Sequence, residues 1–291
     1  MNKNKLIGSI YLAISACIWG GMFVVVKSVV KEIPPIQLVW LRYLIGSIAL
    51  LIIALVAKIK WHWDRKNLLL IFMVGLIGDT ISIVAQESGT MFSSAQLGSV
   101  ITTTTPAFMI IFSWPLLKIK PTKNKWISLI FAILGVVSII GLRFSGKNLL
   151  LGVIFLFIAG LTWALMSVLI ELIDEKYSII QVTFLATLVA IVCLTPIIFI
   201  QRNTLVNISW GSLHIWLSLL YLGIVSTAIA FFLWNKGLVL FHSPTSGLFF
   251  LFQPIVGTLL GWLFLNESIK SGFFIGLGLI SVSIIVSIRN E

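Results

Sequence analysis

Residues 8–22 read GSIYLAISACIWGGM, and residues 152–166 read GVIFLFIAGLTWALM. The two stretches agree at Gly, Ile, Leu, Ile, Trp and Met when the second is moved back by 144 residues. The same offset holds as far as Leu41 and Leu185, and it pairs Gln37 with Gln181. Apolar matches arise easily by chance in a hydrophobic chain, but Trp and Gln matches in the same order indicate an internal duplication.

A second block of matches follows at an offset of 148, with the four extra residues falling between the second and third helices of each unit. The matched pairs are Gly75 with Gly223, Gly89 with Gly237, Pro106 with Pro254, and Leu117 with Leu265. We therefore predict two homologous units, residues 1–145 and 146–291.

The composition places both units in a lipid bilayer. The chain is 59% hydrophobic and 10% charged, whereas soluble domains are about half apolar and about a quarter charged. Ten apolar segments are long enough to span a bilayer, which takes about 20 residues. They are residues 6–26, 37–57, 68–90, 94–116, 126–143, 149–171, 180–200, 213–234, 244–265 and 271–288.

Short connections between these segments leave no room for a soluble catalytic domain. Because each unit has five spans, the second unit enters the membrane from the opposite side. The sequence thus predicts an all-α polytopic membrane protein of ten transmembrane helices, arranged as two inverted five-helix repeats. Inverted repeats are typical of secondary transporters, which bind substrate near the midplane between the repeats.

Basic residues indicate the orientation, because cytoplasmic loops are enriched in Lys and Arg. With the N-terminus inside, thirteen lie on the inner side and seven on the outer side. The seven are Lys27, Lys31, Arg42, Arg143, Lys147, Arg202 and Lys270. We expect a multi-pass protein of the cell membrane (plasma or inner membrane) with both termini in the cytoplasm, and with residues 6–26 retained as a span rather than cleaved as a signal.

Asp79 is an acid near the middle of the third span, where an unpaired charge is costly. Gly75, Asp79, Ser82 and Gln86 are spaced four, three and four residues apart, which places them on one helix face. We interpret Asp79 as a substrate-binding or proton-coupling residue; the alternative is a buried, neutral packing group. Glu87, closer to the helix end, is expected to be solvated.

The fourth span carries Ser99 and Thr103 at helical spacing, followed by Pro106, and the ninth carries Gln253 before Pro254. Proline removes a helical hydrogen bond and frees a carbonyl, and paired interruptions in two halves mark transporter binding sites. The alternative is a purely structural kink.

Aromatic residues supply the remaining candidates. Trp19 and Trp163 are repeat mates that lie deeper than an interfacial belt, so they either line a cavity or pack against neighbouring helices. Phe250 is a weaker candidate of the same kind, and Asn235 with Lys236 is expected to end the eighth span. The predicted substrate-binding set is Trp19, Asp79, Ser82, Gln86, Ser99, Thr103, Trp163, Phe250 and Gln253.

The order of several short motifs resembles the drug/metabolite transporter superfamily, specifically its exporters with two EamA-type domains. The motifs are Ala16-Cys17-Ile18-Trp19-Gly20, Lys27, Arg42, Tyr221-Leu222-Gly223, Pro254 and Leu265-Asn266-Glu267. The resemblance implies ten helices, a central cavity and outward movement of amino acids and other metabolites. A glutamate commonly ends the fourth helix of each half in that family; Glu267 matches it, but the first half has Ile119 there.

Other functions lack their motifs. The chain has no GxxxxGK[ST] loop and no HExxH, and its three histidines are scattered. An intramembrane aspartyl protease needs two aspartates within its spans, and the predicted spans contain Asp79 without a second one. The basic residues form no contiguous face that could bind nucleic acid. We expect a small-molecule exporter that needs no cofactor and no metal. The alternatives are a protein for uptake or facilitated diffusion of another metabolite or a drug-like cation, an intramembrane enzyme, and a receptor. The small-residue faces Gly257–Gly261 and Gly272–Gly276 allow close helix contacts, within the chain or in a homodimer.

Overall fold

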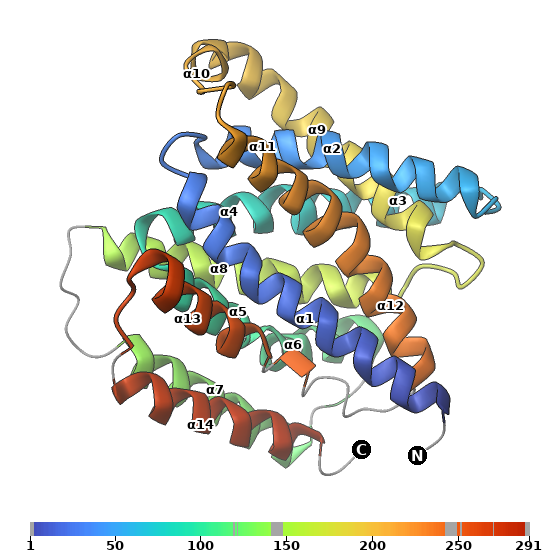
Figure 1. Ribbon diagram of the computed structural model, residues 1–291. Coiled ribbons are helices and arrows are strands. Elements are labelled where there is room, and N and C mark those ends of the chain that lie inside the picture. Colours follow the sequence, from blue (N-terminus) through green and yellow to red (C-terminus); the bar gives the residue numbers. More distant parts are fainter. Residues whose placement is uncertain are drawn as a thin grey trace.

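The computed structural model describes residues 3–118, 120, 122–140, 148–241, 249–250, 252–269 and 271–288. Ile119, the predicted unit boundary at residues 145 and 146, and the predicted start of the ninth span at residue 244 lie outside these ranges. The described residues form helices and the turns and loops that connect them, and they contain no strand (Figure 1).

Helices occupy each of the ten predicted regions. The first half contains α1 (Lys3–Val29), α2 (Pro35–Val56), α3 (Arg65–Val74), η1 (Gly75–Ser82), α4 (Ile83–Phe92), α5 (Ala95–Thr102), α6 (Thr105–Leu117) and α7 (Lys123–Ile140). The second half contains α8 (Leu149–Ile170), α9 (Ile179–Ile200), α10 (Arg202–Val206), α11 (Leu213–Leu220), η2 (Tyr221–Ile229), α12 (Ala230–Phe241), α13 (Phe252–Leu265) and α14 (Ser271–Ile288).

Within the described ranges, seven helical segments are long and apolar enough to cross a membrane, and three shorter apolar helices accompany them. The shorter ones cover Trp126–Ile139, Phe252–Leu265 and Ser271–Ser283. Large apolar side chains face outward, with Val56 79% and Phe199 72% exposed, whereas Gln37 and Glu87 are fully buried. This distribution is the reverse of a soluble protein's, and the chain is a polytopic membrane protein.

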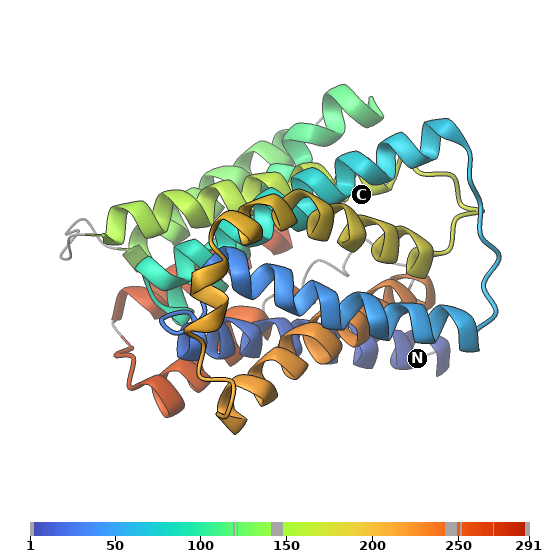
Figure 2. The same cartoon turned by 90° about the horizontal axis from the view of Figure 1, so that it is seen from above.

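Helix packing follows the duplication. Helix α1 packs against α12 and α13, and its repeat mate α8 packs against α4 and α6 (Figure 1). The second span of each half contacts the third span of the other, so that α2 lies on η2 and α9 on η1. Two further pairings join repeat mates directly: α2 packs against α9 (Figures 1 and 2), and α7 packs against α14 (Figure 1). Exchanging the two halves therefore leaves these contacts unchanged.

Matched glycines bring the exchanged helices together. A Cβ atom on Gly8 would lie 2.6 Å from the backbone nitrogen of Phe241 and 3.0 Å from the carbonyl oxygen of Gly237. Their repeat mates repeat the contact, because a Cβ on Gly152 would lie 3.0 Å from the carbonyl oxygen of Gly89. The matches between Gly8 and Gly152, and between Gly89 and Gly237, thus reflect two equivalent points of close helix approach.

The third and eighth spans each contain a π-helical segment, η1 and η2, which the sequence pattern did not predict. Hydroxyls of Thr80 and Thr227 donate to carbonyls five residues earlier, each at 2.8 Å. Such wide turns occur frequently at functional sites in helices. The eighth span continues to Phe241, so the predicted helix end at Asn235 and Lys236 is wrong.

Candidate functional site

A central cavity lies between the two halves and encloses about 540 Å³ of space free of atoms, including its open mouth. Helices α1, α2, α4, α5 and α6 line it from the first half, and α8, η2, α12 and α13 line it from the second. The described lining residues are Trp19, Met22, Phe23, Arg42, Tyr43, Ile83, Gln86, Thr102, Thr105, Ala159, Trp163, Ser226, Phe231, Phe250 and Gln253.

Five of the nine predicted substrate-binding residues lie on this wall: Trp19, Gln86, Trp163, Phe250 and Gln253. The other four, Asp79, Ser82, Ser99 and Thr103, are buried but do not line the cavity. The residues on the wall come from both halves, and those behind it all come from the first.

Aromatic rings form one side of the cavity. The Trp19 ring centre lies 5.5 Å from that of Phe231 and 6.3 Å from that of Phe250, and the Phe231 ring lies 5.7 Å from Trp163. The indole N–H of Trp19 donates to the carbonyl oxygen of Ser226 at 3.1 Å. Ring contacts and this hydrogen bond hold the indole in place, so the repeat-mated tryptophans meet through Phe231 on a rigid apolar wall.

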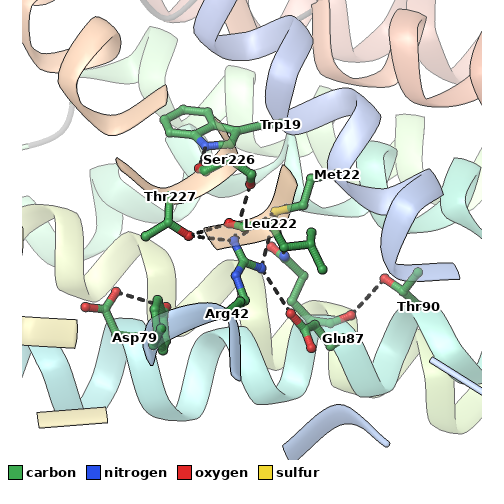
Figure 3. Close-up of polar contacts among 11 residues, drawn as sticks. Trp19, Met22, Arg42, Asp79, Glu87, Thr90, Leu222, Ser226 and Thr227 are labelled. Atoms are coloured by element: carbon green, nitrogen blue, oxygen red, sulfur yellow. Dashed lines mark hydrogen bonds and ion pairs between the residues drawn. The ribbon is translucent and has the colours of Figure 1, made fainter. Parts of the chain in front are cut away.

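Arg42 and Glu87 form a buried ion pair at the cavity (Figure 3). Nη1 of Arg42 lies 3.0 Å from Oε1 of Glu87, and their side chains are 3% and 0% exposed. The expectation that Glu87 is solvated is wrong, because Arg42 points from α2 toward α4 and supplies the counter-charge. Arg42, which was counted with the basic residues of the outer side, is buried within α2.

Three further side chains complete the surroundings of the guanidinium. Nη2 of Arg42 donates to the hydroxyl of Thr227 at 3.1 Å and to that of Ser226 at 3.3 Å, and it contacts the sulfur of Met22 at 3.5 Å. Both hydroxyls belong to η2, which packs on α2. The cation of the first half is therefore held partly by the π-helical segment of the second.

Asp79 lies behind Tyr43, as seen from the cavity. The Tyr43 hydroxyl donates to Oδ1 of Asp79 at 3.3 Å, and Tyr43 itself lines the cavity while Asp79 does not. Asp79 is 5% exposed. In this structure the carboxyl of Asp79 is hydrogen-bonded to a residue of the cavity wall and is not itself part of that wall.

Serine hydroxyls tie the halves together at equivalent positions. Ser82 donates to the carbonyl oxygen of Ala159 at 2.8 Å, and Ser15 donates to that of Ala230 at 2.7 Å. Ser15 and Ala159 are repeat mates, as are Ser82 and Ala230. The contact between the first span of one half and the third span of the other thus contains an equivalent hydrogen bond in both cases. The donor is on the first span in one case (Ser15) and on the third span in the other (Ser82).

The fourth span is interrupted at the threonine run before Pro106. Helix α5 ends at Thr102, α6 begins at Thr105, and Pro106 is the second residue of α6. Because Pro106 lacks an N–H, the carbonyl of Thr102 has no helical donor, and the Thr105 hydroxyl donates to it at 2.7 Å. Pro254 is the third residue of α13.

Ser99 and Thr103 take part in the same interruption. The Thr103 hydroxyl donates to the carbonyl of Ser99 at 2.6 Å, and the Ser99 hydroxyl donates to that of Gln96 at 2.9 Å. Both hydroxyls therefore satisfy backbone carbonyls of their own helix. In this structure they stabilise the end of α5 and do not line the cavity.

The sequence profile of the EamA-like transporter family matches residues 6–141 and 150–289. The chain belongs to this family. An uncharacterized transporter of Archaeoglobus fulgidus is 27% identical over 283 residues, covering 97% of this chain and 99% of that protein. The uncharacterized transporter YoaV of Bacillus subtilis is 25% identical over 272 residues, covering 93% and 92%.

A solved crystal structure shares the fold of this EamA-like chain. It superposes with a TM-score of 0.62 at 20% identity, covering 98% of this chain and 96% of the other. Because the full-length relatives are named transporters and the family is one of transporters, the chain is a membrane transporter and not an enzyme.

At one end of this EamA-like bundle, two charged side chains form hydrogen bonds to the end of α4 and to the start of α5. Nζ of Lys27 donates to three carbonyls that close α4, those of Thr90, Met91 and Ser93, at 2.6 to 3.0 Å. The Glu267 carboxylate accepts from the backbone N–H groups of Ala95 and Gln96, which open α5, at 2.7 and 2.9 Å. Each charge matches the helix end that it caps, which gives the glutamate of the second-half motif a structural role.

The opposite end of the EamA-like bundle is fastened by loop residues. The Tyr177 hydroxyl donates to Oδ2 of Asp64 at 2.7 Å, and Lys176 lies 3.3 Å from the same oxygen. The hydrogen bond from Tyr177 holds the pKa of Asp64 well below its usual range. Asn67 and Asp174 join the cluster, because the backbone N–H of Asp174 donates to Oδ1 of Asn67 at 3.0 Å. The loop before α3 is thus bound to the loop after α8.

Among the described cavity residues that the sequence reasoning missed in this EamA-like transporter, Arg42 is the charged one. It interrupts the apolar run of residues 36–57, and an ionisable residue inside a span is a functional candidate by default. The signal was therefore available, but Arg42 was only counted among the basic residues of the outer side. Its partner Glu87 lies 45 residues away on another span, and that pairing was not visible in the sequence.

Proposed function

We propose that this protein is a secondary transporter that exports small organic metabolites, namely amino acids or related compounds, by alternating access through the central cavity. The observation that carries the proposal is that the cavity is lined by corresponding helices of the two halves. In transporters built from inverted repeats, the site at the repeat interface stays fixed while one half rocks against the other. Outward direction comes from the resemblance to EamA-type exporters.

We assign the substrate to the aromatic wall and the polar groups facing it. Trp19, Trp163 and Phe250 offer an apolar surface, and Gln86 and Gln253 offer amide groups. Ser82, Ser99 and Thr103 support this wall through backbone carbonyls, with Pro106 and Pro254 as the helix interruptions beside it.

We assign Asp79 to coupling rather than to direct substrate contact. It lies one hydrogen bond behind Tyr43, and a buried carboxyl inside a membrane span is a natural carrier of a proton. Movement of the Tyr43 ring would connect or disconnect the carboxyl and the cavity.

We place the protein in the cell membrane with both termini in the cytoplasm, and we divide it at residues 145 and 146 into the two repeats. The basic residues around Lys58–Lys66 favour this orientation. The small-residue face of α14 is occupied within the chain, because a Cβ on Gly276 would lie 2.4 Å from the carbonyl oxygen of Gly135. A homodimer would therefore need another surface.

The direct test is flux in proteoliposomes. Purified full-length protein is reconstituted, and a panel of labelled amino acids, organic acids and organic amines is measured with and without a pH gradient. We expect a subset to move faster than in empty liposomes, with a gradient dependence that Asp79→Asn abolishes. If no compound moves, the transport proposal fails; if Asp79→Asn keeps both rate and gradient dependence, only the coupling role fails.

A further inference from the structure

The turn between α4 and α5 is held by one charged side chain from each half. Lys27 of α1 donates to the last carbonyls of α4, and Glu267, which follows α13, accepts from the first N–H groups of α5. The opposite charges of the two side chains also attract each other. We call Lys27 and Glu267 the outer clamp, because they lie at the end of the bundle away from the N-terminus (Figure 1).

The outer clamp lies one helical turn beyond the cavity wall. Gln86 lines the cavity, and its carbonyl accepts from the hydroxyl of Thr90, whose own carbonyl accepts from Lys27. Phe23 lies four residues before Lys27 and also lines the cavity, and a Cβ atom on Gly98 would lie 2.5 Å from its ring. Helices α1 and α5 therefore touch between the clamp and the cavity, and access from this end requires them to separate.

The duplication does not repeat the clamp at the other end. At the offset of 144 the repeat mate of Lys27 is Glu171, and at the offset of 148 the mate of Glu267 is Ile119, which lies outside the described residues. A carboxylate cannot donate to carbonyl oxygens at a helix end, where the partial charge is already negative, and the isoleucine side chain has no acceptor. The two ends of the bundle thus differ in the chemistry that can hold them closed.

Helix packing differs between the ends in the same sense. Helix α1 packs against α4 and α5, and α13 packs against α5. Within the described ranges the exchanged pair, α8 with α12, has no comparable packing, and it meets through the rings of Trp163 and Phe231 at 5.7 Å. The hydrogen bond between Tyr177 and Asp64 at the inner end joins the loop after α8 to the start of α3, and α3 and α8 already pack on each other.

We infer that the outer clamp is a lock of the transport cycle, which keeps the outer end of the cavity closed in the resting protein and breaks before the cavity opens there. Two identical halves would favour neither direction of opening. Contacts made in one of two states shift the population toward that state, so a clamp at one end makes the protein rest closed at that end. The inference rests on the proposed alternating access and adds its resting state and its outer gate.

The experiment measures distances between spin labels in the full-length protein, reconstituted in lipid with Cys17→Ser and Cys193→Ser. The labelled positions are all exposed: Glu32 with Asn148 at the outer end, and Asn4 with Glu175 at the inner end. In the otherwise unaltered protein we expect the short outer distance to dominate. Lys27→Met/Glu267→Gln should raise the ratio of long to short outer distances about tenfold or more, because a single hydrogen bond to a charged group contributes that factor.

Three variants separate a lock from a simple helix cap. Lys27→Arg keeps the charge and the donors, so it should retain the short outer distance. Lys31→Met removes an exposed lysine four residues further along the chain and is the matched control, which should leave the distances unchanged. Glu267→Gln alone removes one charge and should shift the same ratio in the same direction by a smaller factor. A cap without a gating role would lower stability and leave every distance unchanged.

Unchanged outer distances in the folded double variant would overturn the inference, and so would an equal shift in Lys31→Met. If the double variant does not fold, unchanged distances in Glu267→Gln decide against the lock. Flux of the labelled panel is measured on the same samples. Flux with unshifted distances defeats the lock and leaves the transport function intact, whereas absence of flux from the unaltered protein defeats the proposed function itself.

Discussion

Removing one member of the Arg42–Glu87 pair should cost more stability than removing both. At 3.0 Å and an effective dielectric constant of about 20, the Coulomb energy of two unit charges is about 5 kcal/mol. Stranding one buried charge typically costs about 3 to 5 kcal/mol, and neutral replacement of both partners is often nearly neutral. We therefore expect Glu87→Gln alone to be strongly destabilised and Arg42→Gln/Glu87→Gln to recover most of the loss.

The two single variants should differ. Glu87→Gln leaves a guanidinium that does not release its proton in proteins, whereas Arg42→Gln leaves a carboxyl that can become neutral by taking one up. Glu87→Gln should consequently be the less stable of the two. The assay is the free energy of unfolding in mixed micelles titrated with a denaturing detergent, followed by tryptophan fluorescence.

The analysis of this set as a double-mutant cycle gives the interaction energy directly. Arg202→Gln, on the exposed helix α10, is the control for loss of one arginine and should shift the unfolding free energy by less than about 0.5 kcal/mol. If the losses of the two single variants simply add in the double variant, the buried pair is not coupled and the reasoning is refuted.

Three further outcomes are expected. Gly8→Val should destabilise the bundle by about 1 to 3 kcal/mol through overpacking, because a Cβ on Gly8 would lie 2.6 Å from a backbone atom of α12. Gly278→Ala is the control and should leave the stability unchanged, because a Cβ at Gly278 would have no atom within 4 Å. Equal melting temperatures for the two variants would contradict this prediction. Glu267→Gln should weaken the cap of α5 by about 1 kcal/mol, and amide hydrogen exchange at the first turn of α5 should rise. The Tyr177 hydroxyl depresses the pKa of Asp64 in the folded state. The contribution of ionised Asp64 to folding stability is therefore present at neutral pH and is lost as the pH falls below about 4. Tyr177→Phe should reduce this loss of stability in acid, and an unchanged dependence of melting temperature on pH would refute the prediction.

The fold was largely predictable because the decisive signals were local or periodic. Spans follow from apolar length, and the repeat follows from matched Trp, Gln, Gly and Pro positions. Gly8 and Gly152 show why such matches are informative, because both mark a close helix contact that the exchange of halves repeats. The π-helical turns at η1 and η2 were not predicted, since no residue pattern distinguishes them from ordinary helix.

The site was predicted only in part, because contacts between distant spans decide it. Trp19 and Trp163 were found through their depth and their pairing, and both line the cavity. Asp79 lies in the same span as Gln86, yet Asp79 is hydrogen-bonded to Tyr43 outside the cavity wall, whereas Gln86 lines the cavity. Helical spacing defines a face only for a regular helix, and η1 interrupts that regularity between the two residues.

The central claim is that substrate passes through the cavity between the repeats, and a reversible block of that cavity tests it most directly. Ala159 lies on the cavity wall, whereas its neighbour Ile158 is 38% exposed on the outer surface of the bundle. In a background with Cys17→Ser and Cys193→Ser, Ala159→Cys and Ile158→Cys are each treated with a benzyl methanethiosulfonate after reconstitution.

The flux of the fastest labelled compound of the panel is then measured before and after addition of a reductant. We predict that the reagent stops flux through Ala159→Cys, that the reductant restores it, and that Ile158→Cys is unaffected. Full flux through a completely modified Ala159→Cys protein would show that the route does not run through this cavity.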